Sequence, residues 1–298
     1  MKKYFLIFLA IIFFAGAAVV SLRGFSFGEF PKKIAYFTNT QLASIAALVN
    51  SPFYYNFKVD GTLSETGKMD DSSSPYWWLN SGGQFFLKDG ISKTVQGELS
   101  QFNKWRLAYS LSNPVDTDNG YHPQNIFRLV TRSKWGNFQQ EIYFKINKLN
   151  KSQSPERNAW SGILLFNRYQ NGDNLYYTGI RVDGRAIIKK KINGKYYTMA
   201  EKAFYSGVYN RDTTPNLIPE NKWIGLRSEV KANADGTVNI KVFIDKDNTS
   251  IWTLAAEATD DGKSYGGAAI LNEGYAGIRT DFMDVEFDNY RIKIIDSN

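Results

Sequence analysis

The chain of 298 residues contains no cysteine and a single histidine, His122. Without cysteine the protein has no disulfide, no thiolate nucleophile and no cysteine-ligated metal. One histidine excludes a histidine-rich zinc or iron site, and a Ser-His-Asp triad could be built only around His122. The sequence also has no arginine-rich tract and no nucleic-acid-binding motif. We therefore expect neither an organic cofactor nor a nucleic-acid partner.

Aromatic and aliphatic residues are abundant by contrast. Hydrophobic residues make up 43% of the chain and aromatic residues 15%, which is ample for a packed core. The formal net charge is +7. A modest positive charge suits an anionic polymer or a membrane surface, and it is equally common as ordinary surface charge.

The N-terminus has the pattern of an export signal. It reads "MKKYFLIFLAIIFFAGAAVVSLRGF", with a basic start, a long apolar run and small residues from Ala15 to Ala18. The uncharged run is also about long enough to span a bilayer. Residues 1–22 are thus predicted as a signal peptide or a signal anchor, and residues 23–51 as a linker with a short helix. Either way we expect the protein to be extracytoplasmic, secreted or anchored to the outer face of the membrane, and to meet the membrane only through this segment if it is not cleaved.

From Pro52 onward the sequence predicts strands. Runs rich in Tyr, Phe, Val, Ile and Trp alternate with clusters of Gly, Asn, Asp and Ser, and "NGD" and "NG" mark hairpin turns. No regular alternation of strands and helices is visible, which disfavours a doubly wound fold. We predict an all-β fold for residues 52–298, a two-sheet antiparallel jelly-roll sandwich preceded by the N-terminal apolar helix. The predicted strands are 53–59, 84–91, 125–132, 137–149, 161–170, 174–182, 185–192, 195–202, 222–232, 236–245, 251–260, 274–281 and a final strand ending near 292.

The order of three segments resembles a known superfamily. These are "NLYYTGIRVDGRAIIKKKINGKYY", "NKWIGLRSEVKANADGTVNIKVFIDKD" and the closing "GYAGIRTDFMDVEFDNYRI". They resemble the concanavalin A-like lectins and glucanases, a group that includes laminin-G-like domains and jelly-roll polysaccharide lyases and hydrolases. The resemblance covers residues 53–292 and supports the fold more directly than any activity.

The resemblance also implies a structural ion. In laminarinase-like members an Asp on the final strand ligates calcium, with partners from the first strand region. Asp288 occupies the matching place, and Asp60 or the Gly61 carbonyl would lie opposite. Oxygen ligands of this kind suit Ca²⁺. The alternative is that Asp288 accepts hydrogen bonds from a turn or pairs with Arg291.

Catalytic groups are harder to find. The "E-x-D-x-x-E" strand motif of laminarinase-like hydrolases is missing, since "EFDNYR" has Arg291 in the second Glu position. Elimination by a lyase needs a cation to neutralise a uronate and a group that moves the proton. His122, Tyr177 and Arg181 are the candidate catalytic residues, with His122 in a loop that could overhang the sheet.

Residues four or two apart on a strand share a face, and on this basis further residues are candidates for substrate binding. The run "IIKKKI" is also interpreted as an outer edge strand that its lysines guard against aggregation. Polar and aromatic residues near the 171–173 hairpin add to the candidate surface. The candidate binding residues are Arg128, Arg132, Asn167, Arg168, Tyr169, Tyr176, Lys189 and Lys191.

Three functions remain open. The leading one is binding of a polysaccharide or another glycan by the jelly-roll domain. The second is a polysaccharide-degrading enzyme, a lyase or a glycoside hydrolase, acting at the concave face. The third is a non-catalytic adhesion module that binds protein, and nothing in the sequence separates it from sugar binding.

Overall fold

A computed structural model describes residues 53–296 of the chain. The predicted signal segment, residues 1–22, and the linker, residues 23–51, lie outside the described residues. Among residues 53–296 no helix is long and apolar enough to cross a membrane.

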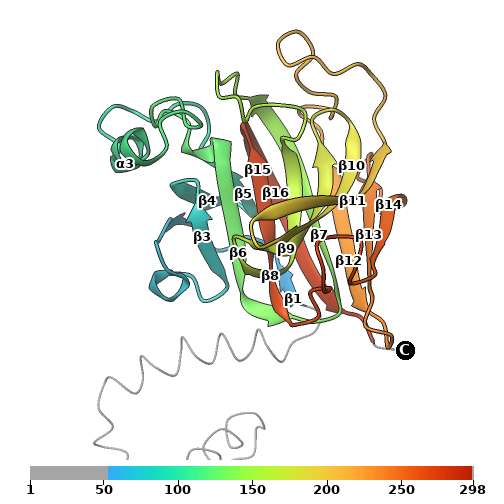
Figure 1. Cartoon of the computed structure of the whole chain (residues 1–298). Coiled ribbons are helices and arrows are strands. Elements are labelled where there is room, and N and C mark those ends of the chain that lie inside the picture. Colours follow the sequence, from blue (N-terminus) through green and yellow to red (C-terminus); the bar gives the residue numbers. More distant parts are fainter. Residues whose placement is uncertain (1–52, 297–298) are drawn as a thin grey trace, which may run out of the picture. The chain divides into compact units, whose positions relative to one another are not determined.

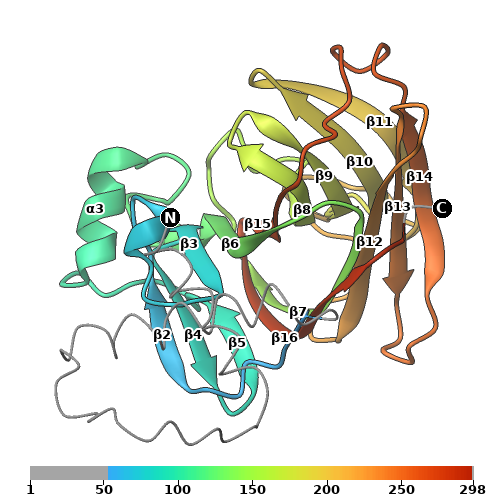
Figure 2. The same cartoon turned by 90° about the horizontal axis from the view of Figure 1, so that it is seen from below.

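The described part of the chain forms two antiparallel sheets that pack face to face, as Figure 2 shows from below. The predicted jelly-roll sandwich is therefore confirmed. The nine-stranded sheet has the order β14 (Thr253–Asp260), β13 (Val238–Asp245), β12 (Ile224–Ala232), β7 (Phe138–Leu149), β16 (Met283–Ile294), β5 (Ile91–Thr94), β4 (Gln84–Lys88) and β2 (Gly61–Ser64), with β1 (Phe53–Tyr55) paired to β16. The seven-stranded sheet has the order β11 (Lys195–Ala203), β10 (Arg185–Ile192), β9 (Asn174–Arg181), β8 (Gly162–Asn171), β15 (Gly274–Asp281), β6 (Ile126–Trp135) and β3 (Trp77–Ser81).

The core lies between the sheets because alternate residues of each strand point inward. On β7 the inward positions from Phe138 to Ile146 are buried, while Glu141 and Tyr143 point to the other face. Each large apolar side chain that is buried in this way contributes about 1.5–3 kcal/mol. The core fixes the register of every strand, since a slip of one residue would turn its apolar set to solvent.

The N-terminal half departs most from the predicted strands. The run 84–91 is two strands, β4 and β5, because Asp89 and Gly90 both take positive φ (54° and 79°) and make a tight turn. The run 53–59 ends as a strand at Tyr55, and residues Gly61–Ser64 form a separate strand, β2.

One helix, α3 (Lys104–Ser112), was not predicted. Its N-terminus is capped by Asn103, whose side-chain oxygen accepts a hydrogen bond from the Trp105 amide at 2.8 Å. The helix belongs to the connection between β5 and β6 and lies at the β3–β6 side of the molecule (Figure 1). The other described helices are two short 3₁₀ turns, Met69–Asp71 and Pro123–Asn125.

The outer face of the seven-stranded sheet carries its own apolar layer. Leu164, Phe166, Tyr177 and Ile187 form a second buried cluster there, separate from the core between the sheets. Two connections, 113–125 before β6 and 150–161 before β8, lie at one end of these strands. The outer face of the seven-stranded sheet is therefore bordered at one end by these two loops.

Candidate functional site

A groove of about 650 Å³ lies over the outer face of the seven-stranded sheet. Its floor is built from outward-facing residues of β6, β8, β9, β10, β11 and β15, and its wall from the segments around 113–116 and 156–161. From β6 to β11 the sheet makes five strand spacings, or about 24 Å. The groove is therefore large enough for a chain-like ligand that crosses the strands.

Aromatic rings line one part of the groove. The rings of Tyr177 and Tyr196 lie with their centroids 5.9 Å apart. Trp160 is 45% exposed, and the Lys189 Nζ atom lies 3.6 Å from the centre of its ring. Exposed rings beside hydrogen-bonding groups suit flat apolar faces that carry polar edges, such as those of sugar rings.

Arginine side chains line another part of the floor. Arg279 on β15 is directly paired with Arg128 on β6. The Arg279 Nε atom donates to Asp281 Oδ1 at 2.8 Å. The Nε atom of Arg128 is buried and has no hydrogen-bond partner within residues 53–296, and the same holds for the Oδ2 atom of Asp281.

The ionisable groups of the floor have shifted pKa values. Burial, with the nearby Arg181 and Arg279, lowers the pKa of Lys189 to about 8. Burial raises the pKa of Tyr177 to about 12. Burial also acts to raise the pKa of Tyr196, but Arg279 and Lys191 outweigh it and leave that pKa below its ordinary value. Lys189 can thus exchange a proton near neutral pH, and Tyr196 ionises more readily than its neighbour.

Three carboxylates complete the lining. Asp116 and Glu156 come from the two wall segments, and Asp281 ends β15. The Asp116 Oδ1 atom accepts a hydrogen bond from the Ser154 hydroxyl at 2.6 Å, which joins the two wall segments. The groove therefore contains both positively and negatively charged hydrogen-bonding groups.

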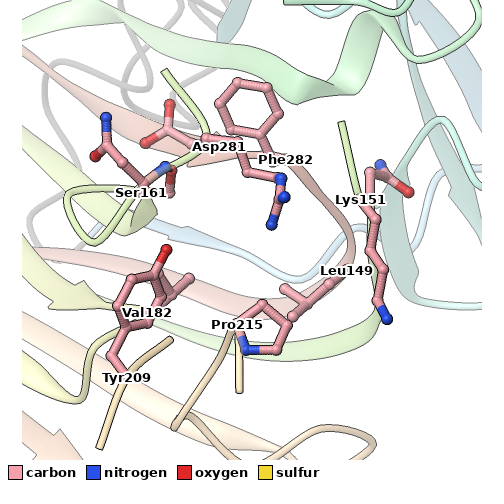
Figure 3. A pocket seen from close by; sticks show the side chains of 11 residues that line it. Leu149, Lys151, Ser161, Val182, Tyr209, Pro215, Asp281 and Phe282 are labelled. Carbon is pink, nitrogen blue, oxygen red and sulfur yellow. Dashed lines mark hydrogen bonds between the residues drawn. The ribbon is translucent and has the colours of Figure 1, made fainter. Parts of the chain in front are cut away.

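A much smaller cavity lies beside the groove and shares Asn158, Ser161, Asp281 and Phe282 with it. Figure 3 shows its lining, with Tyr209 across from Asp281. Its volume of about 10 Å³ is room for roughly one water molecule. The larger groove is therefore the candidate site.

Three sequence-predicted residues lie in this groove: Arg128, Tyr177 and Lys189. Arg181 lies just behind it. Its guanidinium pairs with Asp183 and with Glu201, and its Cζ atom lies 3.8 Å from the centre of the Trp160 ring. Arg181 thus supports the tryptophan, and the structure gives it no direct place in the groove lining.

Three other candidates point elsewhere. His122 is not among the residues that line the groove, and its Nδ1 atom contacts Asp118 Oδ2 at 2.9 Å within its own loop. Arg132 donates to the Ser74 carbonyl at 2.7 Å, and Lys191 donates to the Gly172 carbonyl at 2.7 Å. The hypothesis that places these side chains on the ligand surface needs correction, since each is used in local structure.

The candidates near the 171–173 hairpin are also corrected, because they are buried. Asn167 and Tyr176 point between the sheets, where Asn167 contacts Thr178 and the Tyr176 hydroxyl donates to Asp260 at 2.6 Å. Arg168 is 1% exposed and donates to three oxygens, and Tyr169 packs against Phe166. A register shift in β8 between Asn167 and Asn171 changes which residues face outward.

The residues predicted to bind calcium are not brought together. Asp288 follows Phe287 on β16, and Phe287 is paired with Ser92 on β5. Ser92 is paired in turn with Leu87 on β4, and Leu87 with Gly61 on β2. Gly61 thus lies three strand spacings away, or about 14 Å. Asp60 instead accepts a hydrogen bond from the Asp89 amide at 2.9 Å. A single ion shared by Asp288 with Asp60 or Gly61 does not fit this register.

The sequence did not predict several of the residues that line the groove. Arg279 and Asp281 are two apart on β15 and so share a face, a signal that was present in "GIRTD". Trp160, Asp116 and Glu156 lie in connections, where no periodicity marks which side chains turn inward. The loop positions therefore needed the three-dimensional structure.

No protein-family model matches the chain, and no curated protein sequence matches it. Among solved structures it is similar to the carbohydrate-binding module CBM66 from Bacillus subtilis, with 13% identity and a TM-score of 0.45 over 73% of this chain and 94% of that one. It is also similar to a Bacillus licheniformis beta-glucanase, with 13% identity and a TM-score of 0.44 over 83% and 100%. A Bacillus subtilis protein with a galectin-like fold gives 13% identity and a TM-score of 0.46 over 84% and 98%. At these TM-scores the fold of the chain rests on its own sheet topology.

Proposed function

We propose that the groove over the seven-stranded sheet binds a polysaccharide, and that it does so outside the cytoplasm. The observation that carries this proposal is the groove itself, which spans about five strand spacings. Exposed aromatic rings and unsatisfied polar atoms lie in the same lining. The export pattern of residues 1–22 supports the location.

Trp160 is the residue that tests the proposal. Full-length protein would be measured for retention on a panel of immobilised neutral and acidic polysaccharides. Replacing Trp160 by Ala removes the exposed ring and should weaken binding about five- to tenfold, since an aromatic contact is worth about 1 kcal/mol.

The chain offers a matched control on the opposite sheet. The Trp252 ring has the Arg227 guanidinium 3.9 Å from its centre, as Trp160 has Arg181 at 3.8 Å. The Trp252→Ala variant should therefore lose a similar stacked arginine yet bind normally. Equal losses in the two variants, or no retention of the wild type on any glycan, would count against the proposal.

A second candidate function is degradation of the polysaccharide in the same groove. It is favoured by the carboxylates of Asp116, Glu156 and Asp281 and by the lowered pKa values of Lys189 and Tyr196. Paired carboxylates serve hydrolysis, and a tyrosine or lysine with a lowered pKa can move a proton in an elimination. Release of reducing ends, with or without the ultraviolet absorbance of an unsaturated uronate, distinguishes hydrolase, lyase and binding protein.

Structural calcium remains a proposal at Asp288 alone. Its carboxylate is half-buried and accepts hydrogen bonds from the Asn289 amide at 2.7 Å and from the Asn289 side chain at 2.9 Å. A carboxylate in this state fits one oxygen ligand of a hard cation, with backbone carbonyls as the others. Thermal unfolding in calcium and in EDTA checks this, and an Asp288→Asn variant should lose any calcium-dependent rise in Tm. Identical curves in calcium and EDTA would contradict it.

A further inference from the structure

Two arginines face the groove from paired positions. Arg128 and Arg279 are directly opposite each other across β6 and β15, so their Cβ atoms lie about 5 Å apart. Like charges at such positions repel and destabilise the pair. The arrangement therefore needs negative charge close by.

Of these two arginines, only Arg279 has an ion pair within residues 53–296. Arg279 is held by Asp281 at 2.8 Å, and its charge helps to lower the pKa of the nearby Tyr196 hydroxyl. Arg128 has a buried Nε atom without a hydrogen-bond partner among residues 53–296. A buried donor of a charged group is costly to leave unpaired, because it has lost its water and gained nothing.

Two arginines on other faces have carboxylate partners. Arg227 on β12 pairs with Glu141 at 2.7 Å, and Arg157 pairs with Asp212 at 3.3 Å. Arg185 and Arg211 also have a buried Nε atom without a hydrogen-bond partner among the described residues, so this feature is not confined to the groove; Arg128 differs from them in lining it.

We propose that Arg128 and Arg279 form a subsite for the carboxylate of a uronic acid residue, which makes the ligand of the groove a carboxylated polysaccharide. The inference rests on the proposed function and names its substrate class. The Arg128 side chain lines the groove and is partly exposed, and the planar fork of its guanidinium matches a carboxylate.

The wall of the groove selects a carboxylated chain over a densely sulfated one. Asp116, Glu156 and Asp281 all line it, so a ligand with several negative charges on each sugar meets repulsion there. A uronate polymer carries one negative charge per acid residue and keeps free hydroxyls between the charges. Lys189 lies farther along the floor, three strands beyond β15, where it offers a second positive point.

The experiment uses calorimetric titration of the full-length protein with three kinds of oligosaccharide. These are oligogalacturonate, the same oligosaccharide with its carboxylates reduced to neutral alcohols, and a sulfated oligosaccharide. Oligogalacturonate should bind, and the reduced form should bind about ten- to hundredfold more weakly, as expected when a charged hydrogen bond is lost. The reduced ligand needs no variant, so it tests the subsite even where a substitution disturbs folding.

Arg128→Gln should cause a similar ten- to hundredfold loss for oligogalacturonate and little change for the reduced form. Arg132→Gln is the matched control on the same strand, because the Arg132 guanidinium contacts the Ser74 carbonyl instead of the groove. It should bind like the wild type.

Each alternative result has a clear consequence. Equal binding of the acidic and reduced oligosaccharides would overturn the acid subsite and leave polysaccharide binding in place. Binding of the sulfated ligand alone would overturn the choice of carboxylate. No binding of any of the three, together with no retention on the wider polysaccharide panel, would overturn the proposed function and this inference with it.

Discussion

Replacing Lys190 by Met should destabilise the protein strongly, although the residue lies in a run of three lysines. Its side chain is fully buried between the sheets. Its Nζ atom lies 2.8 Å from each of three oxygens, Asp260 Oδ2 and the carbonyls of Gly267 and Ala268. All three ammonium hydrogens therefore have acceptors.

The expected loss follows from what the substitution leaves behind. Asp260 is also fully buried, and without Lys190 it keeps only the Tyr176 hydroxyl at 2.6 Å and the Gly262 amide at 3.0 Å. Removing one partner of a buried ion pair costs about 3–5 kcal/mol, because the other charge stays in a dry environment. For a domain of this size that is roughly 6–20 °C in Tm.

Urea unfolding followed by tryptophan fluorescence measures this loss. Lys191→Met is the control on the same strand: its partner Asp173 is exposed, so that pair contributes about 1 kcal/mol or less. Adding Asp260→Asn to Lys190→Met should recover part of the stability. The reasoning is refuted if Lys190→Met loses no more than Lys191→Met, or if the double variant is less stable than the single one.

Three other results are expected. Affinity for an acidic oligosaccharide should fall as the pH rises through about 8, because a bound anion favours protonated Lys189 and Lys189 loses its proton in the free protein near that pH. The Lys189→Arg variant should show no such fall. A fall that persists in this variant would assign the pH dependence to another group. Arg128→Gln should leave the Tm unchanged or raise it, since it removes repulsion from Arg279, and a marked drop would show that Arg128 has a structural partner. Gly179→Ala should lower stability by about 1–3 kcal/mol because its Cβ would lie 2.2 Å from the Ile163 carbonyl oxygen, whereas Gly172→Ala, with open space around it, should be neutral.

The sequence predicted the regular part of the fold well. From β6 onward every predicted run became a strand, because apolar alternation and Asn-Gly turns are local signals that the packed sheets also require. The N-terminal part was less predictable, since short strands and a capped helix of nine residues leave weak periodicity.

The candidate site was predicted only in part, and the lysine run shows why. "IIKKKI" was interpreted as an exposed edge, yet β11 covers β10 on that side, Lys190 enters the core and Lys189 enters the groove. The alternation of side chains along a strand predicts that adjacent residues face opposite sides of the sheet. It does not predict which side faces the core when Asp260, distant in the sequence, neutralises a buried lysine.

By itself the sequence determined that residues 53–296 form two antiparallel sheets, because the period of two in their side chains leaves each strand one way to bury its apolar face. Only the tertiary structure decided which polar residues meet in the groove. Arg128 and Arg279 are 151 positions apart and become neighbours through strand pairing, while Trp160 and Asp116 reach them from loops. Such meetings depend on long-range register and loop path, which local sequence patterns do not encode.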